Sequence, residues 1–148
     1  MRARLMLAAS AMLAGISMFG SAASAQTVQF FTVLAGGNEV PTGDPNGQGV
    51  ASVMLGASGQ VCFSILTRLI ATPIAAHIHE GKPGVAGPIV IPLTAPTPAG
   101  IPQTFTSVGC LTGQNTAVLA RLKATPSNFY INVHTGPHPA GAARGQLF

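Results

Sequence analysis

Short runs rich in apolar residues make up the chain after residue 26, and turn-forming residues separate the runs. Eight runs have the β-branched or aromatic content that is typical of strands. They are Thr27–Leu34, Val50–Leu55, Gln60–Leu66, Ile74–His79, Ile89–Ile91, Thr104–Leu111, Phe129–His134 and Ala143–Phe148. Their spacing of roughly 8–12 residues predicts an all-β sandwich or barrel.

The stretches between these runs predict loops and one helical turn. Residues 36–49 and 92–102 are rich in glycine and proline and are expected to be irregular, whereas Gly56–Gly59 has the composition of a hairpin turn. Residues 117–123 are the one segment with a helical pattern. No amphipathic helix is longer than about two turns, so the sequence excludes alternating β-α-β units.

The first 25 residues have the pattern of a signal peptide. Arg2 and Arg4 precede an apolar stretch, Leu5–Phe19, and Ala23-Ser24-Ala25 forms a cleavage site. We expect residues 1–25 to be removed and residues 26–148 to form one domain in a periplasm or outside the cell. An uncleaved anchor is the alternative, although the apolar stretch is shorter than the roughly 20 residues that span a bilayer. No later segment could span a membrane after cleavage.

Charged residues are scarce. Lys and Arg number seven and Asp and Glu three among 148 residues, or 7%, against about 25% in an average soluble protein. This shortage excludes a disordered polyelectrolyte and a long solvated helix. There is no basic run, so nucleic acid is not an expected partner.

The two cysteines, Cys62 and Cys110, are expected to form a disulfide. An even number of cysteines in an exported chain favours pairing, because the compartment is oxidising. Two buried thiols are the alternative. Two cysteines 48 positions apart do not resemble a zinc knuckle.

All four histidines lie in two short segments, His77-Ile-His79 and His134-Thr-Gly-Pro-His138. Because positions i and i+2 of a strand share a face, His77 and His79 should project side by side while Ile78 faces the core. His134 ends another strand, and the turn after it could bring His138 back. If the segments are neighbours, up to four imidazoles meet and suit copper or zinc. The lack of nearby Asp and Cys favours copper over zinc.

A metal-free alternative is that these histidines only hydrogen-bond the tight turns that flank them. Glu80 is the one carboxylate beside the cluster. A metal ion requires neutral imidazoles, so its affinity is expected to fall as the pH drops through about 6.5.

Arg144 is the second candidate, as a structural residue or an anion contact. A guanidinium in a nearly uncharged domain needs fixed acceptors, which are either loop carbonyls or the carboxylate of Glu39. Asn132 precedes His134 by two residues and shares its strand face; it is expected to fix a loop rather than bind an ion. The only aspartate, Asp44, lies in a glycine-rich loop, so the sequence gives little support to Ser-His-Asp catalysis.

Three blocks of the sequence together resemble the CHRD domain, which is named for chordin and occurs in many exported bacterial proteins. They are LAGGNEVP at 34–41, AHIHEGKPGVAGPIVIPL at 76–93 and YINVHTGPHPAGAARGQL at 130–147. The resemblance implies an immunoglobulin-like Greek-key β-sandwich, distantly similar to copper/zinc superoxide dismutases. It matches His77, His79 and His134 to the family's histidines and Arg144 to its arginine, whereas His138 falls where the family is less uniform.

One departure from the family pattern affects Arg144. The family usually has G-E-I-R-G-Q, whereas this chain has Gly-Ala-Ala-Arg-Gly-Gln at 141–146, so Ala142 replaces the usual glutamate. If Arg144 needs a carboxylate partner, Glu39 is then the one expected to supply it.

The sequence favours a binding module over an enzyme. The first hypothesis is an exported protein that coordinates copper, or less favourably zinc, through His77, His79, His134 and His138. The second is a structural or protein-interaction module without metal, whose partner would be another exported protein. A superoxide dismutase-like enzyme is the remote third, because no segment supplies the second, zinc-bearing site that those enzymes use.

Overall fold

A computed structural model of the protein describes residues 27–148. The expected signal peptide, residues 1–25, lies outside the described residues. Within residues 27–148, no helix is long and apolar enough to cross a membrane.

The described chain forms nine strands and one α-helix, which confirms the prediction of an all-β fold. The strands are β1 (Val28–Ala35), β2 (Gln48–Leu55), β3 (Val61–Arg68), β4 (Pro73–Glu80), β5 (Ile89–Leu93), β6 (Thr97–Pro98), β7 (Thr104–Leu111), β8 (Phe129–Thr135) and β9 (Ala143–Gln146); the helix is α1 (Thr116–Ala124). Eight strands match the predicted runs. The ninth, β6, lies in the proline-rich stretch that was expected to be irregular, where two residues pair with β7.

Alternation of side chains produces the first three strands. In β1, Phe30, Thr32 and Leu34 are buried while their neighbours face outward, and β2 and β3 follow the same period of two. The predicted hairpin turn between β2 and β3 contains Ser58 and Gly59, both with positive φ (55° and 77°). Glycine takes this conformation without a steric penalty, which is why the turn forms there.

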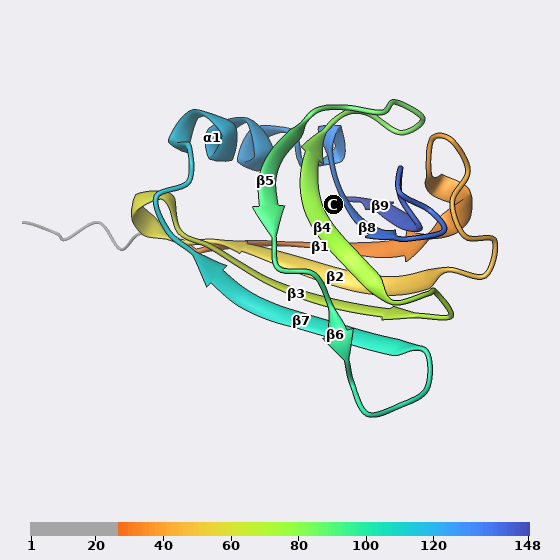
Figure 1. Ribbon diagram of the computed structural model, residues 1–148. Helices are drawn as coiled ribbons and strands as arrows, with labels where there is room; N and C mark the ends of the chain where they lie inside the picture. The colour runs from red at the N-terminus through yellow and green to blue at the C-terminus, as the bar shows by residue number, and fades with distance from the viewer. Residues whose placement is uncertain (1–26) are drawn as a thin grey trace, which may run out of the picture.

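The strands are hydrogen-bonded in the order β5-β4-β8-β9-β1-β2-β3-β7-β6, with all neighbours antiparallel. Only one residue pair, Ala35 with Arg144, joins β9 to β1, and the sheet folds over at this seam. The result is two layers, β5-β4-β8-β9 above β1-β2-β3-β7-β6, as Figure 1 shows. This arrangement is the predicted sandwich.

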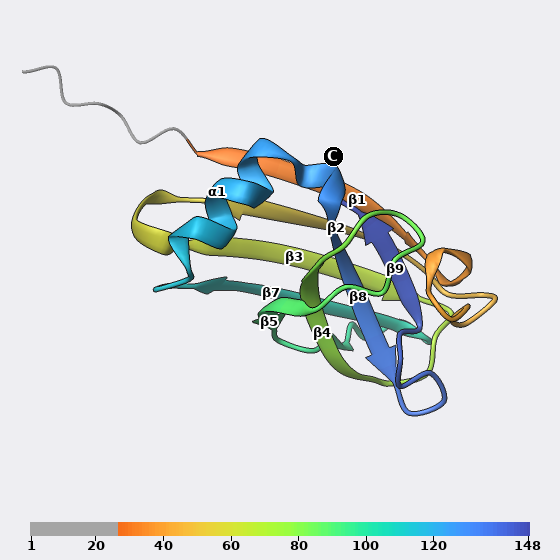
Figure 2. The same ribbon diagram turned by 90° about the horizontal axis from the view of Figure 1, so that it is seen from above.

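The core lies between the two layers. Ile78, Ile131 and Val133 of the smaller layer are fully buried with Val53 and Ile65 of the larger one. The helix α1 covers one end of the sandwich (Figure 2) and adds two buried leucines, 119 and 122. Its first turn is capped by the side chain of Asn115, which accepts from two backbone amides.

Cys62 of β3 and Cys110 of β7 are directly opposite in the register and form a disulfide, as predicted. The bond lies on the outer face of the larger layer, where Cys110 is exposed.

Candidate functional site

The outer face of β4, β8 and β9 carries most of the polar residues that the sequence singled out. Alternation in β4 places Ala76 and Ile78 in the core, so His77 and His79 point to the other side, as predicted. All seven residues of β8 are buried, which means that its outer face is covered too. The loop at 81–88 passes over this face (Figure 2).

Strand register arranges the outer-face side chains in rows. One row runs from His77 through Asn132 to Arg144, and the neighbouring row runs from His79 through Tyr130 to Gln146. His134 lies two residues beyond Asn132 on the same face of β8. Histidines separated by more than fifty residues in the sequence thereby become neighbours.

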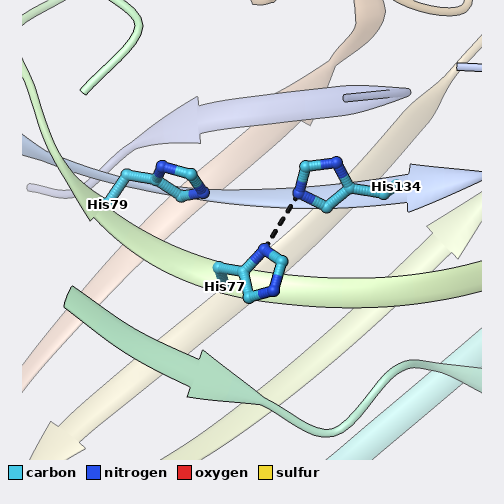
Figure 3. A group of neighbouring side chains, drawn as sticks. All are labelled: His77, His79 and His134. Atoms are coloured by element: carbon cyan, nitrogen blue, oxygen red, sulfur yellow. Dashed lines mark hydrogen bonds between the residues drawn. The ribbon is translucent and has the colours of Figure 1, made fainter. Parts of the chain in front are cut away.

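Three imidazoles converge at this place (Figure 3). Nδ1 of His77 lies 3.0 Å from Nε2 of His134. One ring nitrogen from each of His77, His79 and His134 lies within 4.8 Å of the other two. Two nitrogens that share an ion at about 2.0–2.1 Å are at most about 4.2 Å apart. Three nitrogens spaced evenly around one ion are about 3.6 Å apart, so the group could hold a metal ion after the rings move by about 1 Å.

Backbone carbonyls fix the orientation of two of these rings. Nδ1–H of His79 donates to the carbonyl of Gly87 at 2.8 Å, and Nδ1–H of His134 donates to the carbonyl of Pro139 at 3.0 Å. In a neutral ring the other nitrogen, Nε2, then keeps its lone pair. The Nε2 of His79 is buried and has no hydrogen-bond partner. Metal-binding histidines commonly have this second hydrogen bond, because it sets the tautomer and the direction of the lone pair.

Burial keeps the three imidazoles neutral. It lowers the pKa of His77 to about 4, and the adjacent His134 and His79 rings lower it further by disfavouring a second charge. Burial also lowers the pKa of His79 and of His134, although the hydrogen bonds to Gly87 and Pro139 partly offset this. At neutral pH no ring has to lose a positive charge before an ion binds. Nδ1 of His77, which donates to Nε2 of His134, has to pass its proton to the other nitrogen of the ring before it can be a ligand.

The two other groups considered beside the cluster lie elsewhere. His138 is not part of the group of three, because its Nε2 faces Asp44 with 3.9 Å to Oδ2. The carboxylate of Glu80 accepts two hydrogen bonds from Arg121, each 2.8 Å long, and these lower its pKa. It therefore faces the surface rather than the histidines.

Arg144 is buried and bonds loop carbonyls. Its guanidinium donates to the carbonyls of Val85 (2.8 Å) and Lys82 (2.9 Å) and covers the ring of Tyr130 at 3.4 Å. Of the two kinds of acceptor considered for Arg144, the structure has the loop carbonyls, and Glu39 forms no ion pair with it within 4.0 Å. Backbone carbonyls, rather than a carboxylate, supply the acceptors, and the loop at 81–88 is thereby tied to β9.

Glu39 is nevertheless buried near the same face. Burial raises the pKa of Glu39 to about 7, and the nearby Arg144 charge and Asn132 amide offset only part of that rise. Its Oε1 has no hydrogen-bond partner, and neither has Oδ1 of Asn132. Asn132, predicted to fix a loop, lies in the row between His77 and Arg144.

Sequence reasoning missed Tyr130 and Gln146. The ring of Tyr130 stacks on His79 with centroids 4.7 Å apart, and its hydroxyl accepts from the amide of Gly87. Gln146 donates to the carbonyls of Gly81 and Ser127. Both could have been found by extending the alternation from His134 and Arg144 along their strands, since each shares a face with its candidate.

Comparison with known proteins gives one match. The family model of the CHRD domain matches residues 30–147, nearly the whole described chain. No curated protein and no solved structure matches it. The matched range includes all residues of the histidine group and Arg144.

Proposed function

Because the chain belongs to the CHRD domain family, we propose that it is an exported binding module whose histidine group coordinates a transition metal, with copper favoured over zinc. The ligands are Nδ1 of His77 and Nε2 of His79 and His134. The protein carries or buffers the ion outside the cytoplasm. CHRD domains occur in extracellular and exported proteins, and the Cys62–Cys110 disulfide fits that location.

The observation that carries this proposal is the fixed direction of two lone pairs. The carbonyls of Gly87 and Pro139 hold the Nδ1 protons of His79 and His134, so both Nε2 atoms keep a lone pair. The lone pair of His79 has no partner, whereas that of His134 accepts from Nδ1–H of His77, a bond that an ion would replace. A ring that served only to bond a turn would not need a second, buried and unpartnered nitrogen, yet His79 has one. Leaving such a group unsatisfied costs about 1–3 kcal/mol, which an ion would recover.

The donor set supports copper. The group contains three imidazoles and neither carboxylate nor thiolate. Three histidines with an open fourth position also hold zinc in catalytic sites, but copper(II) binds a given nitrogen site more tightly than zinc. A three-imidazole group therefore favours copper where both ions are present.

Metal analysis of the purified full chain, produced with its leader in an exporting host, tests the proposal. We expect about one copper per chain after exposure to equal copper and zinc, and less than about a tenth of that in the His77→Ala/His79→Ala variant, because one remaining ring cannot hold the ion. His138→Ala is the matched control, since this histidine lies outside the group, and it should keep the parent's content.

Equal metal content in the parent and the double variant would overturn the proposal. Thermal unfolding separates loss of ligands from loss of fold: the parent's melting temperature should rise with copper and return with chelator, and that of the double variant should not respond. If neither copper nor chelator changes the parent's melting temperature, the result favours the metal-free structural or interaction module, in which the rings only bond loop carbonyls.

A further inference from the structure

The outer face of the larger layer is apolar and exposed. Six large apolar side chains point outward from β1, β2, β3 and β7 there. They are Phe31, Val33, Val50, Met54, Leu66 and Val108, with exposed fractions from 36% for Leu66 to 78% for Val108. The smaller layer and α1 lie on the opposite side of this sheet (Figure 1).

The register places five of these side chains in two adjacent rows. Phe31, Ser52, Ser64 and Val108 form one row across the four strands. Val33, Val50 and Leu66 form the row beside it. The only charged side chain on the outward positions of these strands is Arg68, at the end of β3. Monomers rarely expose contiguous apolar patches larger than a few hundred Å².

We propose that this face binds the same face of a second copy of the chain, forming a twofold-symmetric dimer with two sheets packed face to face. Sheets that pack in this way lie about 10 Å apart and interdigitate their side chains. The interface therefore resembles the core between the two layers of a single chain.

The size of the face fits a stable dimer. Each of the four strands has eight residues. At about 4.8 Å between strands and about 3.3 Å per residue, they cover a footprint of roughly 500 Å². Side chains that stand out from the sheet add to the area, which approaches the roughly 800 Å² that each partner contributes to a standard interface.

The face is also complementary to itself. A twofold interface needs a projection and a hollow on the same surface, because each partner supplies both. Phe31 projects from β1 with 49% of its surface exposed. A hollow of about 210 Å³ lies over the small residues Ser52 and Ser64 and is lined by Val50, Leu66 and Phe31 itself, which forms one wall.

A lipid surface is the less suitable occupant. Proteins that lie on membranes surround an apolar face with Lys and Arg, which bind anionic headgroups. On this face Arg68 stands alone, and its guanidinium donates to Gln48 on the neighbouring strand. The same face of a second copy, which is equally poor in charge, is the better match for this face.

The dimer is independent of the proposed metal function, since the histidine group lies on the outer face of the other layer. Failure of either proposal would leave the other intact.

Sedimentation equilibrium of the purified full chain, from about 1 to 500 μM, tests the dimer. We expect a monomer–dimer equilibrium in the parent and in the Ile74→Lys control, which places a lysine on β4 at a similarly exposed apolar position (61%, against 64% for Val33). Val33→Lys and, separately, Val108→Lys should raise the dissociation constant at least about a hundredfold, because a twofold interface contains each substitution twice.

Two further measurements make each outcome decisive. Melting temperatures of the two lysine variants at 1 μM within a few degrees of the Ile74→Lys control would show that the fold is intact. A parent that stays monomeric at 500 μM overturns the proposal. Dimers of unchanged dissociation constant in both the Val33→Lys and the Val108→Lys variant also overturn it. Flotation of the monomer with neutral phosphatidylcholine vesicles overturns it as well, because the face would then bind a lipid surface.

Discussion

Burial gives the three residues of the histidine group lower pKa values than a solvent-exposed histidine has. A solvent-exposed imidazole titrates near pH 6.5, whereas burial lowers the pKa of His77 to about 4 and shifts His79 and His134 in the same direction. The sequence alone gave no means to foresee this, because burial of an outward-facing strand position depends on the loop at 81–88 that covers it.

We therefore expect the bound metal to be retained to a lower pH than it would be by solvent-exposed histidines. We expect copper binding to be nearly constant from about pH 7.5 to about pH 5 and to fall as the pH approaches 4, where His77 gains a proton. Equilibrium dialysis across this range measures the effect, with circular dichroism to confirm that the chain stays folded. A midpoint near pH 6.5 would contradict the prediction and restore the expectation from the sequence.

Glu39 should make stability depend on pH in the opposite direction. Its pKa is raised in the folded chain, from 4.5 to about 7. The folded state therefore holds a proton that the unfolded state releases, and the associated stability is present below about pH 4.5 and lost as the pH rises through about 7. The buried histidines have lowered pKa values, so their contribution lowers the free energy of unfolding as the pH falls below about 6.5. The contribution of Glu39 can therefore be isolated only by comparing variants.

Glu39→Gln should remove the loss of stability that the parent shows as the pH rises through about 7. The shift of about 2.5 pKa units corresponds to about 3 kcal/mol, so the variant's free energy of unfolding should exceed the parent's by up to about 3 kcal/mol at pH 8 and by little at pH 4. Urea unfolding at both pH values measures it. Glu80→Gln is the control: Arg121 lowers the pKa of that carboxylate, so its effect should be small and of opposite sign. A gain for Glu39→Gln that is equal at both pH values would contradict the prediction.

Among the elements, the seam between β9 and β1 decides how the sheet folds into two layers. A Cβ at Gly145 would lie 2.1 Å from Oγ1 of Thr32 and 2.3 Å from the carbonyl oxygen of Val33. Both are in β1, and one of them is backbone, so the two strands cannot accommodate a side chain without separating. Glycine at this position lets the layers meet.

Gly145→Ala should destabilise the protein by about 3 kcal/mol or more, as overpacked cores do. Thermal and urea unfolding measure the loss. Gly136→Ala, where a Cβ would meet nothing within 4 Å, is the matched control and should change stability by less than about 0.5 kcal/mol. Equal effects of the two substitutions would show that the seam tolerates a side chain.

Most elements could be predicted because strand patterns are local. The runs at 50–55, 104–111 and 129–134 lie within β2, β7 and β8, since alternation, β-branched residues and flanking turns are all written in neighbouring positions. β6 could not be predicted in the same way. Its two residues are a strand only because β7 lies alongside them, which is a tertiary contact.

At the scale of the whole molecule, the disulfide links β3 to β7 within the larger layer. In the chain-entropy view, closing a loop of 48 residues restricts the unfolded chain and stabilises the fold by about 4 kcal/mol. Cys62→Ala/Cys110→Ala should lower the free energy of unfolding by about that amount while leaving the folded structure, and the copper content, unchanged. Urea unfolding of the variant, beside the parent with and without reductant, measures it; no loss in either case would contradict the prediction.

The sequence by itself determined the fold class, the pairing of the only two cysteines and the shared face of His77 and His79, because each depends on strand periodicity or on a count. Tertiary structure decided which distant groups meet. It brought His134 to the pair and turned His138 towards Asp44, and it gave Arg144 loop carbonyls in place of Glu39. Strand order and loop coverage set these contacts, and they are properties of the folded sheet that no local pattern of residues contains.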